Sequence, residues 1–336
     1  MLNARGKPLW RVILFRTFLI LFTIILFLAG GLFGAVVLIN YGPSPAARDL
    51  LVMTSLETSA LKFLATSFFS EEELEHIISD NSIHVSSEIT DVNKIKIPNK
   101  DEKTTEQINS IEIKEISGPT YRGRMMIVKD PSRVSVGTSY PFGKDCKGKS
   151  IETMMEENNA IAAINGGGFE DIGGVGNGGT PIGIVIRNGV LQWGYKEAKY
   201  DLIGFDNENR LILGTMTGGE ALEKGVRDAL SFGPFLIING KPSQMKGTAG
   251  GLNPRTAIGQ RADGAVLLLT IDGRQTGSLG ANYGDLIKIM QEFGAVNAAN
   301  LDGGSSSAMY YEGELISISS SLYGVRDMPT CILVSE

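Results

Sequence analysis

A long apolar stretch near the start of the chain is the clearest pattern in the sequence. From Thr17 to Ile39 there are 23 residues without a charged side chain, rich in Leu, Ile and Phe. A helix of about 20 apolar residues crosses the roughly 30 Å hydrocarbon layer of a membrane. Residues 17–39 are therefore predicted to form a transmembrane helix.

Four basic residues lie on the N-terminal side of this stretch. Arg5, Lys7, Arg11 and Arg16 precede it, and the first acidic residue is Asp49. Because positive charge stays on the cytoplasmic side, residues 1–16 are predicted to be a cytoplasmic tail of a single-pass plasma-membrane protein with its C-terminal domain outside the cytoplasm. A cleaved signal peptide is the alternative, but its apolar region is usually about 7 to 15 residues long. A retained anchor is favoured.

Helical spacing follows the apolar stretch. Residues 40–85 carry Leu and Phe at near-helical intervals, and Ser70 and Glu73 have the spacing of a capping box at the start of a second helix. Two interpretations are open, a helical stalk above the membrane and a helix packed on the main domain. Residues 86–107 are polar without apolar periodicity, which is typical of a linker.

Short apolar runs punctuated by Gly dominate residues 108–336. Asn188-Gly189 is a strong hairpin signal and Asp263-Gly264 indicates another turn. The runs predict strands at Met125–Lys129, Ala160–Ile164, Ile182–Arg187, Val190–Trp193, Leu202–Phe205, Leu211–Leu213, Phe235–Ile238, Thr256–Gln260, Ala265–Ile271 and Ala308–Tyr311.

Helices are predicted to be fewer in this region. The candidates are Ser150–Asn158, a stretch near Glu220–Leu230, and Gly284–Phe293, the last with one apolar face and Gly294 at its end. Many strands with interspersed helices indicate an α+β fold, a strand-rich mixed domain preceded by the transmembrane helix and the helical stalk.

Charge and the Cys and His content exclude several function classes. The net charge is −6. Without the four basic residues of the tail, the chain has 27 basic and 37 acidic residues, which argues against nucleic acid as a partner. Two Cys residues exclude a disulfide-dense scaffold, while a Cys146–Cys331 disulfide and two buried thiols both remain open. Because His76 and His84 lie outside the Gly-rich region, an imidazole triad or a His-ligated metal is not expected in the site.

Three buried strands are predicted to end in an amide or a carboxylate followed at once by Gly. These side chains are Asn165, Asp272 and Asp302. Strand ends hold side chains rigidly, and Gly lets a ligand approach the backbone closely. A single Asp-Gly is usually only a turn, but three such endings favour a functional site.

An Arg stands at the start of another predicted strand, in Asn253-Pro-Arg255-Thr-Ala-Ile-Gly259. A guanidinium offers paired donors suited to phosphate or carboxylate oxygens. In a domain of net negative charge, Arg255 is a candidate for binding an anionic substrate, with a structural salt bridge as the alternative.

Five segments in order resemble the successive motifs of the phosphodiester glycosidase family. They are Ala163–Phe169, Phe232–Gly240, Asn253–Gly259, Thr270–Arg274 and Asn300–Ser306. The resemblance covers residues 108–336. It implies hydrolysis of a sugar-1-phosphodiester, with a carbohydrate phosphodiester as substrate and site residues that include Asn165, Arg255, Asp272 and Asp302.

One motif departs from the family pattern. After Asn-Gly-Gly the family commonly has two aromatic residues and then Asp, whereas this chain has Gly168, Phe169 and Glu170. The change removes one surface on which a sugar could stack. It is the main support for a second interpretation, a non-catalytic glycan-binding or scaffold protein in exopolysaccharide or envelope assembly.

The expected binding roles follow from the charge of the substrate. Arg255 is expected to bind the phosphate, and the amides of Gly303 and Gly304 to assist it. Arg274 and Thr256 are further candidates for substrate binding.

The expected catalytic roles fall on carboxylates. A phosphomonoester is already a stable leaving group, so the heavier demand is for activating water or supplying a nucleophile at C1. Asp302 is the leading candidate for this base or nucleophile, and Asp272 is its rival. Glu170 is a candidate acid or supporting group, and Asn165 is expected to hold sugar hydroxyls or to orient a carboxylate.

No cofactor is required by these residues. Carboxylates and carbonyls could hold Ca²⁺, but no loop has calcium-binding spacing, so metal dependence stays open. A serine hydrolase built on residues 305–307 is a third interpretation, although the run lacks Gly-x-Ser-x-Gly spacing and a nearby His. The sugar, the polymer and the oligomeric state are not predicted.

Overall fold

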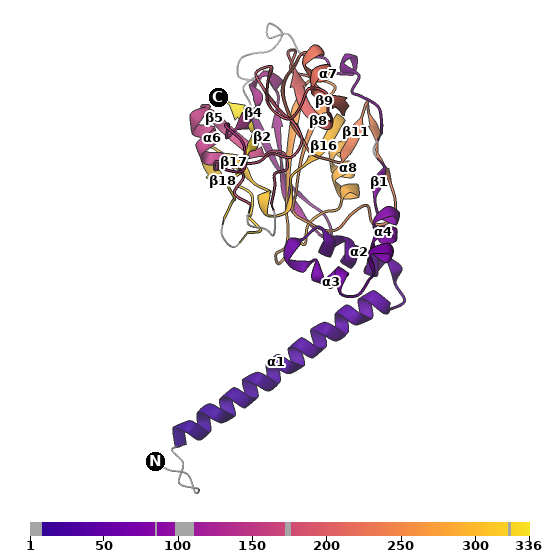
Figure 1. Ribbon diagram of the computed structural model, residues 1–336, viewed down its shortest axis with the longest axis vertical. Coiled ribbons are helices and arrows are strands. Elements are labelled where there is room, and N and C mark those ends of the chain that lie inside the picture. Colours follow the sequence, from indigo (N-terminus) through magenta and orange to yellow (C-terminus); the bar gives the residue numbers. More distant parts are fainter. Residues whose placement is uncertain (1–8, 85, 98–110, 172–175, 322–323) are drawn as a thin grey trace.

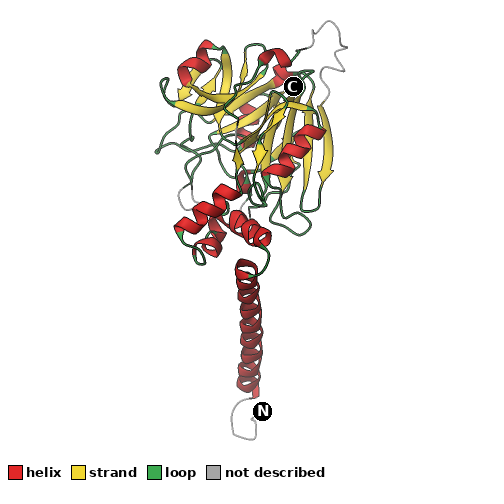
Figure 2. Cartoon of the chain, turned by 90° about the vertical axis from the view of Figure 1, so that its right-hand side faces the viewer, coloured by secondary structure: helices red, strands yellow, loops and turns green. Residues whose placement is uncertain are grey.

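The computed structural model describes residues 9–84, 86–97, 111–171, 176–321 and 324–336. Helix α1 (Leu9–Tyr41) projects from the body of the molecule (Figures 1 and 2). Within Trp10–Tyr41, an 18-residue window has a mean hydropathy of 2.7 and is not buried by the rest of the chain. A helix of this length and composition can cross a membrane, as an anchor or as a signal sequence.

Three antiparallel sheets form the body. The largest has seven strands in the order β12-β11-β16-β14-β15-β3-β2. Their bounds are β2 (Ile111–Ser117), β3 (Arg122–Val128), β11 (Phe235–Ile238), β12 (Lys241–Pro242), β14 (Arg255–Arg261), β15 (Val266–Asp272) and β16 (Ala295–Leu301).

The other two sheets have five strands each, in the orders β18-β17-β5-β19-β4 and β7-β6-β10-β8-β9. The first contains β4 (Val134–Thr138), β5 (Ala160–Asn165), β17 (Met309–Tyr311), β18 (Glu314–Leu315) and β19 (Thr330–Ser335). The second contains β6 (Val185–Arg187), β7 (Val190–Trp193), β8 (Lys199–Asp206), β9 (Leu211–Thr217) and β10 (Val226–Ser231).

All three sheets contribute to one apolar core. Met126, Leu268 and Ile258 of the large sheet meet Ile164 and Phe205 of the smaller ones there. The opposite face of the large sheet is covered by α8 (Tyr283–Glu292), while α6 (Ile151–Glu157) and α7 (Gly218–Glu223) pack on the smaller sheets. Short 3-10 turns lie at η2 (Val92–Lys94), η4 (Pro131–Arg133) and η6 (Gly304–Ser306).

The α+β, strand-rich fold predicted from the sequence is confirmed. The Asn188-Gly189 hairpin joins β6 to β7, with both residues at positive φ as this turn requires. The helix expected near residues 220–230 is wrong in its second half. Val226–Ser231 forms β10, because its pairing with β6 and β8 outweighs its local helical preference.

A small helical module follows α1 and lies between it and the sheets (Figure 2). We use this name for residues 45–80, which comprise α2 (Pro45–Leu56), η1 (Ser59–Leu61), α3 (Phe63–Thr66) and α4 (Glu71–Asp80). The predicted capping box of Ser70 and Glu73 opens α4. The module has its own apolar centre around Val52, Ala65 and Ile77.

The helical module packs on the main domain. The side chain of Asn81, at its end, binds the backbone of Thr248, and β1 (Ile83–His84) pairs with β13 (Gln244–Met245). Of the two interpretations left open by the sequence, the structure has the helices packed on the domain.

Residues 86–97, the described part of the expected polar linker, also run along the domain. The hydroxyl of Thr90 exchanges hydrogen bonds with the backbone of Leu213, and the amide of Lys96 donates to the carbonyl of Ala262. This part of the linker is therefore held by backbone pairing that its polar composition does not reveal. Residues 98–107 lie outside the described residues.

Candidate active site

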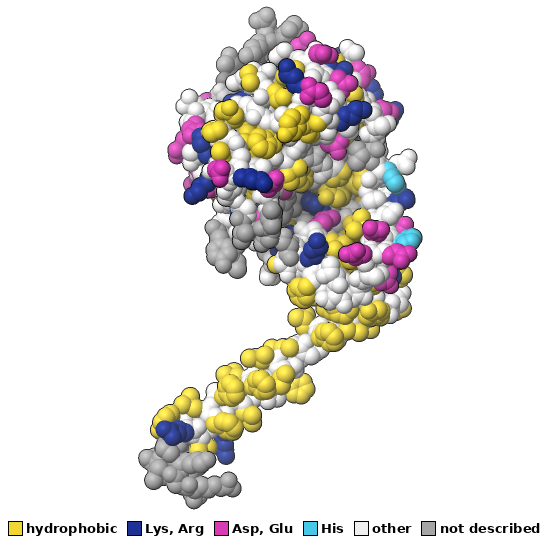
Figure 3. All heavy atoms as spheres, in the orientation of Figure 1, with side chains coloured by type: hydrophobic (Ala, Val, Ile, Leu, Met, Phe, Trp, Pro, Cys, Tyr) yellow, Lys and Arg dark blue, Asp and Glu magenta, His cyan; other side chains and the backbone are white. Residues whose placement is uncertain are grey.

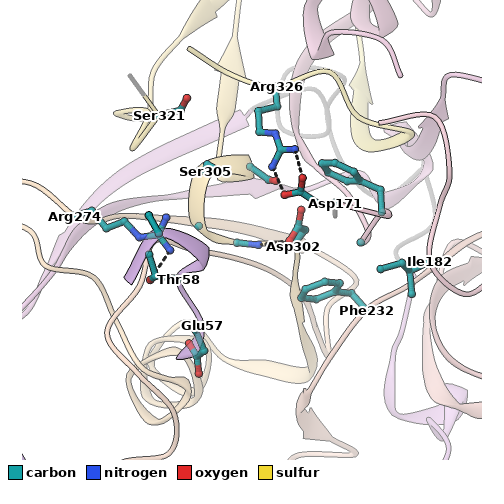
Figure 4. A pocket seen from close by; sticks show the side chains of 16 residues that line it. Glu57, Thr58, Asp171, Ile182, Phe232, Arg274, Asp302, Ser305, Ser321 and Arg326 are labelled. Atoms are coloured by element: carbon teal, nitrogen blue, oxygen red, sulfur yellow. Dashed lines mark hydrogen bonds and ion pairs between the residues drawn. The ribbon is translucent and has the colours of Figure 1, made fainter. Parts of the chain in front are cut away.

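One pocket of about 570 Å³ lies where the helical module meets the ends of β5 and β16 (Figure 4). Its walls come from six separate parts of the chain. The lining residues are Glu57, Thr58, Ala60, Gly168, Phe169, Asp171, Ile182, Phe232, Arg274, Asp302, Gly303, Gly304, Ser305, Ser306, Ser321 and Arg326.

Asp302 directly follows the buried strand β16, so the sheet fixes its position. Its backbone amide donates to the carbonyl of Gly166 (3.1 Å), and its Oδ1 accepts a hydrogen bond from the amide of Gly303 (3.0 Å). Burial raises the pKa of Asp302 to about 6, against the opposing effect of hydrogen bonds from Ser306 and Gly303. A carboxyl group with this pKa can exchange a proton near neutral pH.

Asn165 ties the end of β5 to Asp302 from behind. Its Nδ2 donates to the carbonyl of Asp302, and its Oδ1 accepts from the Thr256 hydroxyl (2.7 Å) and the amide of Ala308 (3.1 Å). Asn165 and Thr256 are both fully buried. Neither side chain lines the pocket, so the expected contacts of Asn165 with sugar hydroxyls and of Thr256 with substrate are not formed. Asn165 instead holds the backbone of Asp302, which relates to its other expected role of orienting a carboxylate.

Asp171 forms a second acidic group in the same pocket, and Figure 4 shows it beside Asp302. Arg326 donates two hydrogen bonds to it, of 2.6 and 2.8 Å, and the amide of Gly176 adds a third at 2.7 Å. The hydrogen bonds from Arg326 hold the pKa of Asp171 below its ordinary value, despite partial burial. The two carboxyl groups of the pocket thus have pKa values shifted in opposite directions.

Arg326 connects the two acids with an aromatic wall. Its guanidinium lies 5.0 Å from the centre of the Phe169 ring, and it interacts electrostatically with Asp302 as well as with Asp171. Sequence reasoning missed both Asp171 and Arg326. Asp171 directly follows Glu170, which was the expected acidic residue of that motif. Arg326 lies in an irregular segment that contains no recognised motif.

Arg274 lies on the opposite side of the pocket. One of its amino groups, Nη2, donates to the Thr58 hydroxyl (3.1 Å) and to Asn253 Oδ1 (3.0 Å). Within the described chain it has no carboxylate within 4.0 Å, and burial together with the nearby Arg255 lowers its pKa. A guanidinium held by neutral partners in a pocket is suited to an anionic ligand.

Gly303 and Gly304 line the pocket next to Arg274, but their amides are already used. The amide of Gly303 donates to Asp302 and that of Gly304 to the carbonyl of Pro254 (2.8 Å). Their expected role as phosphate-binding amides is therefore corrected. Gly304 has a φ of +61°, and a Cβ there would lie 3.3 Å from Arg274 Nη2, so glycine leaves the space that this guanidinium needs.

Arg255 lies behind the pocket wall and does not line the pocket. Its Nη2 donates to Glu57 Oε2 (2.5 Å) and to the carbonyl of Gly251 (2.9 Å), and its guanidinium stacks 4.1 Å from the Tyr283 ring centre. The side chain is only 7% exposed. The expected direct contact with phosphate is therefore not formed in this pocket, because the guanidinium is buried and bonded to Glu57, Gly251 and Ala281.

Asp272 and Glu170 also lie away from the pocket. Asp272 lines a separate groove of about 370 Å³, where its Oδ1 accepts from the amide of Ile318 (2.9 Å) and its Oδ2 is 3.8 Å from Arg124. Glu170 is exposed and is not among the lining residues. The structure thus brings together Asp302, Arg274, Gly303 and Gly304 of the predicted site and separates Asp272 and Glu170 from it.

At Gly168, where the family commonly has an aromatic residue, a different segment supplies the aromatic ring. Phe232 and Ile182 line the pocket there, and a Cβ on Gly168 would lie 3.0 Å from the Phe232 ring. An aromatic surface is therefore present although the chain lacks the aromatic residue at position 168.

Neither a histidine nor a disulfide belongs to the described site. The described residues that line the pocket include no His, so Ser305 has no imidazole base there. Cys146 and Cys331 are free thiols. Among the residues that the structure describes, no group of three or more His, Cys, Asp or Glu side chains could hold a metal ion.

Comparison with known proteins assigns the family. The model of the phosphodiester glycosidase family matches residues 158–335, more than half of the chain. The chain belongs to the phosphodiester glycosidase family. The match includes the segments that carry Asn165, Asp171, Arg274, Asp302 and Arg326, and it leaves out the helical module.

Two curated relatives match the chain, and the second of them supports this family membership. The chain is 32% identical over 189 residues to the SPbeta prophage-derived uncharacterized protein YomE of Bacillus subtilis (strain 168), which covers 53% of this chain and 28% of that protein. It is 28% identical over 182 residues to bovine N-acetylglucosamine-1-phosphodiester alpha-N-acetylglucosaminidase, covering 50% of this chain and 34% of the relative. The chain thus spans about a third or less of each relative's length.

A solved structure has the same fold. The catalytic domain of the zebrafish N-acetylglucosamine-1-phosphodiester alpha-N-acetylglucosaminidase, auto-inhibited by its pro-peptide, superposes with a TM-score of 0.55 at 24% identity. The superposition covers 68% of this chain and 82% of that domain. The sheets that place Asp302 and Asp171 are thus those of a phosphodiester glycosidase fold.

Proposed function

We propose that this protein is a membrane-anchored hydrolase that cleaves the glycosidic bond of a sugar-1-phosphodiester outside the cytoplasm. Its family membership supports the reaction class. The apolar helix α1, with basic residues before it and in its first turns, supports the anchor and its orientation. The printed activity of the bovine relative makes N-acetylglucosamine-1-phosphate diesters the first substrates to test.

The observation that carries the proposal is the pair of carboxyl groups in the pocket. Asp302 has a pKa raised to about 6 and Asp171 has a lowered one. Two acidic groups whose environments move their pKa values apart are typical of an acid–base site. Near neutral pH Asp171 is ionised, and Asp302 can accept a proton.

In the proposed step, the carboxylate of Asp302 takes a proton from a water molecule as the water oxygen attacks C1 of the sugar. The bond between C1 and the phosphate oxygen breaks, and its electron pair leaves with the phosphomonoester. Because this leaving group is a stable anion, protonating it is a lesser demand than in ordinary glycosidases. Asp171, held by Arg326, stabilises the positive charge that develops on the sugar ring.

Arg274 is proposed to bind the phosphate. It faces the pocket across from the two acids, and its partners Thr58 and Asn253 are neutral. Its charge is therefore not cancelled by a direct carboxylate partner in the described structure. The same guanidinium stabilises the negative charge that gathers on the phosphate as the C1–O bond breaks.

The test uses the purified full chain in detergent and the methyl ester of N-acetylglucosamine-1-phosphate. Release of free sugar is followed by NMR for the wild type, for Asp302→Asn and, as a control, for Asp272→Asn. The proposal expects turnover in the wild type and the control and its loss in Asp302→Asn. Turnover that persists in Asp302→Asn contradicts the catalytic assignment, and an inactive wild type on a panel of sugar-1-phosphodiesters contradicts the reaction class.

A further inference from the structure

The helical module joins the pocket to the apolar helix. Glu57, Thr58 and Ala60 line the pocket, although they lie outside the residues that the family model matches. The same short segment continues into Leu61 and Phe63, whose side chains are 38% and 58% exposed. Glu57, Thr58 and Ala60 thus face the pocket, and Leu61 and Phe63, which follow them, expose apolar side chains on the surface.

The module also packs against the upper part of α1. The Tyr41 hydroxyl donates to the carbonyl of Phe68 (3.1 Å), and the Tyr41 ring lies 6.2 Å from that of Phe69. The ring of Phe33, lower on α1, lies 6.2 Å from that of Phe68. These contacts fix the position of the module along the axis of α1.

If α1 spans the bilayer, these contacts place the module at the outer membrane surface. Phe33 comes 16 residues after Thr17, which at 1.5 Å per residue is about 24 Å along the helix. That is less than the roughly 30 Å of the hydrocarbon layer, so Phe33 lies below its outer boundary when Thr17 marks the inner one. Phe68, in contact with Phe33, then lies in the interfacial layer.

The exposed surface of the module has the composition of an interfacial contact. Apolar side chains continue from α1 onto the adjoining surface of the module (Figure 3). Lys62 stands exposed between Leu61 and Phe63, where its ammonium can reach lipid headgroups while the two apolar side chains enter the interface. Continuity with α1, which is proposed to cross the membrane, favours the bilayer as the occupant of this surface.

We propose that Leu61 and Phe63 insert into the outer interfacial layer and hold the pocket at the membrane surface, so that the substrate is a sugar-1-phosphodiester whose second ester is to a lipid. This inference rests on the proposed function. The lipid chain stays in the bilayer while C1 of the sugar reaches Asp302 in the pocket. The element that lies at the membrane supplies Thr58, which holds the proposed phosphate-binding Arg274.

The test compares two substrates in the same vesicles, with the full chain reconstituted. One is N-acetylglucosamine-1-phosphate esterified to a long-chain isoprenoid alcohol, and the other is its soluble methyl ester. The Leu61→Ser/Phe63→Ser variant is expected to lower turnover of the lipid ester about tenfold, from the loss of two partly inserted apolar side chains. Turnover of the methyl ester should stay within about twofold of the wild type, because neither side chain lines the pocket.

Two further variants sharpen this test. Phe63→Trp keeps a side chain favoured at membrane interfaces and is expected to keep the wild-type ratio of the two activities. Val190→Ser/Tyr195→Ser removes side chains that are 61% and 75% exposed and should leave the ratio unchanged. Val190 lies in β7 and the backbone of Tyr195 lies beside the start of α7, which is far from α1 (Figure 1).

The outcomes separate this inference from the proposed function. The interfacial role is overturned if the ratio of lipid-ester turnover to methyl-ester turnover is unchanged in Leu61→Ser/Phe63→Ser, including the case in which both activities fall equally. A wild type that hydrolyses the methyl ester but not the lipid ester overturns the lipid substrate and leaves the hydrolase intact. A wild type inactive on both esters, and on other sugar-1-phosphodiesters, overturns the proposed function itself.

Discussion

Glu57 and Arg255 form an ion pair of 2.5 Å that joins the helical module to the start of β14. Arg255 is buried and Glu57 is 23% exposed, and Glu57 also accepts hydrogen bonds from Asn253 and the amide of Gly251. The pair thus connects a pocket wall outside the matched family region to the centre of the large sheet.

Breaking this pair should lower stability. Glu57→Gln leaves the buried guanidinium of Arg255 without its counter-charge, and we expect a loss of about 2–3 kcal/mol in the free energy of unfolding. Urea unfolding of the full chain in detergent measures it. Glu112→Gln is the matched control, because its pair with Lys114 is about half exposed on both sides and should contribute little. Equal effects of the two variants would contradict the structural role of Glu57.

The sequence predicts the strands well where local pattern and tertiary pairing agree. Val190–Trp193 and Phe235–Ile238 form with the expected bounds, because alternating or continuous apolar residues are bounded by Gly or Asn there. Val226–Ser231 shows the opposite case. Its residues suit a helix locally, and only its neighbours in the sheet make it a strand.

The sequence predicts only those pocket residues that follow the end of a buried strand. Asp302 directly follows β16 and lies in the pocket, but Asp272 ends β15, two strands away in the same sheet, and lines another groove. Both have the same Asp-Gly signature, so local sequence cannot separate them. Arg326 reaches Asp171 from 155 residues further along the chain, a pairing that no local pattern contains.

Asp272, which the sequence put forward, and Asp171, which it missed, should behave differently. Asp272→Asn keeps a side chain that can accept the bond from Ile318, outside the pocket, and should retain turnover within about threefold of the wild type. Asp171→Asn removes the charge that faces Asp302 and should lower kcat about 100-fold. Single-turnover assays on the methyl ester separate the two. A reversed order of effects would move the reaction to the Asp272 groove.

Activity on the phosphodiester should depend on the planar shape of the Arg274 guanidinium. Arg274→Lys keeps the charge but loses the planar guanidinium, so we expect kcat/KM for the phosphodiester to fall at least about tenfold. Hydrolysis of a neutral aryl glycoside of the same sugar should change little. Arg122→Lys, in the separate groove, serves as the control. Equal losses on charged and neutral substrates would contradict phosphate binding by Arg274.

Asp302 should make stability depend on pH. Burial raises its folded pKa from 3.8 to about 6, so the folded state holds the proton more tightly and loses stability as pH rises through this interval. Asp302→Asn removes that loss. Relative to the wild type, the variant should therefore gain on the order of 2 kcal/mol between pH 4 and pH 7. Thermal melts at the two pH values test this, and a difference independent of pH would show that Asp302 is not desolvated.

The pH dependence of kcat/KM for a soluble sugar-1-phosphodiester tests the central claim most directly. Because Asp302 is proposed to act as a base, kcat/KM should rise with pH through an apparent pKa near 6 and then level off. Asp302→Asn should be at least about 100-fold slower and should lack this rise. A profile that falls through pH 6, or one that keeps its rise in Asp302→Asn, would contradict Asp302 as the base.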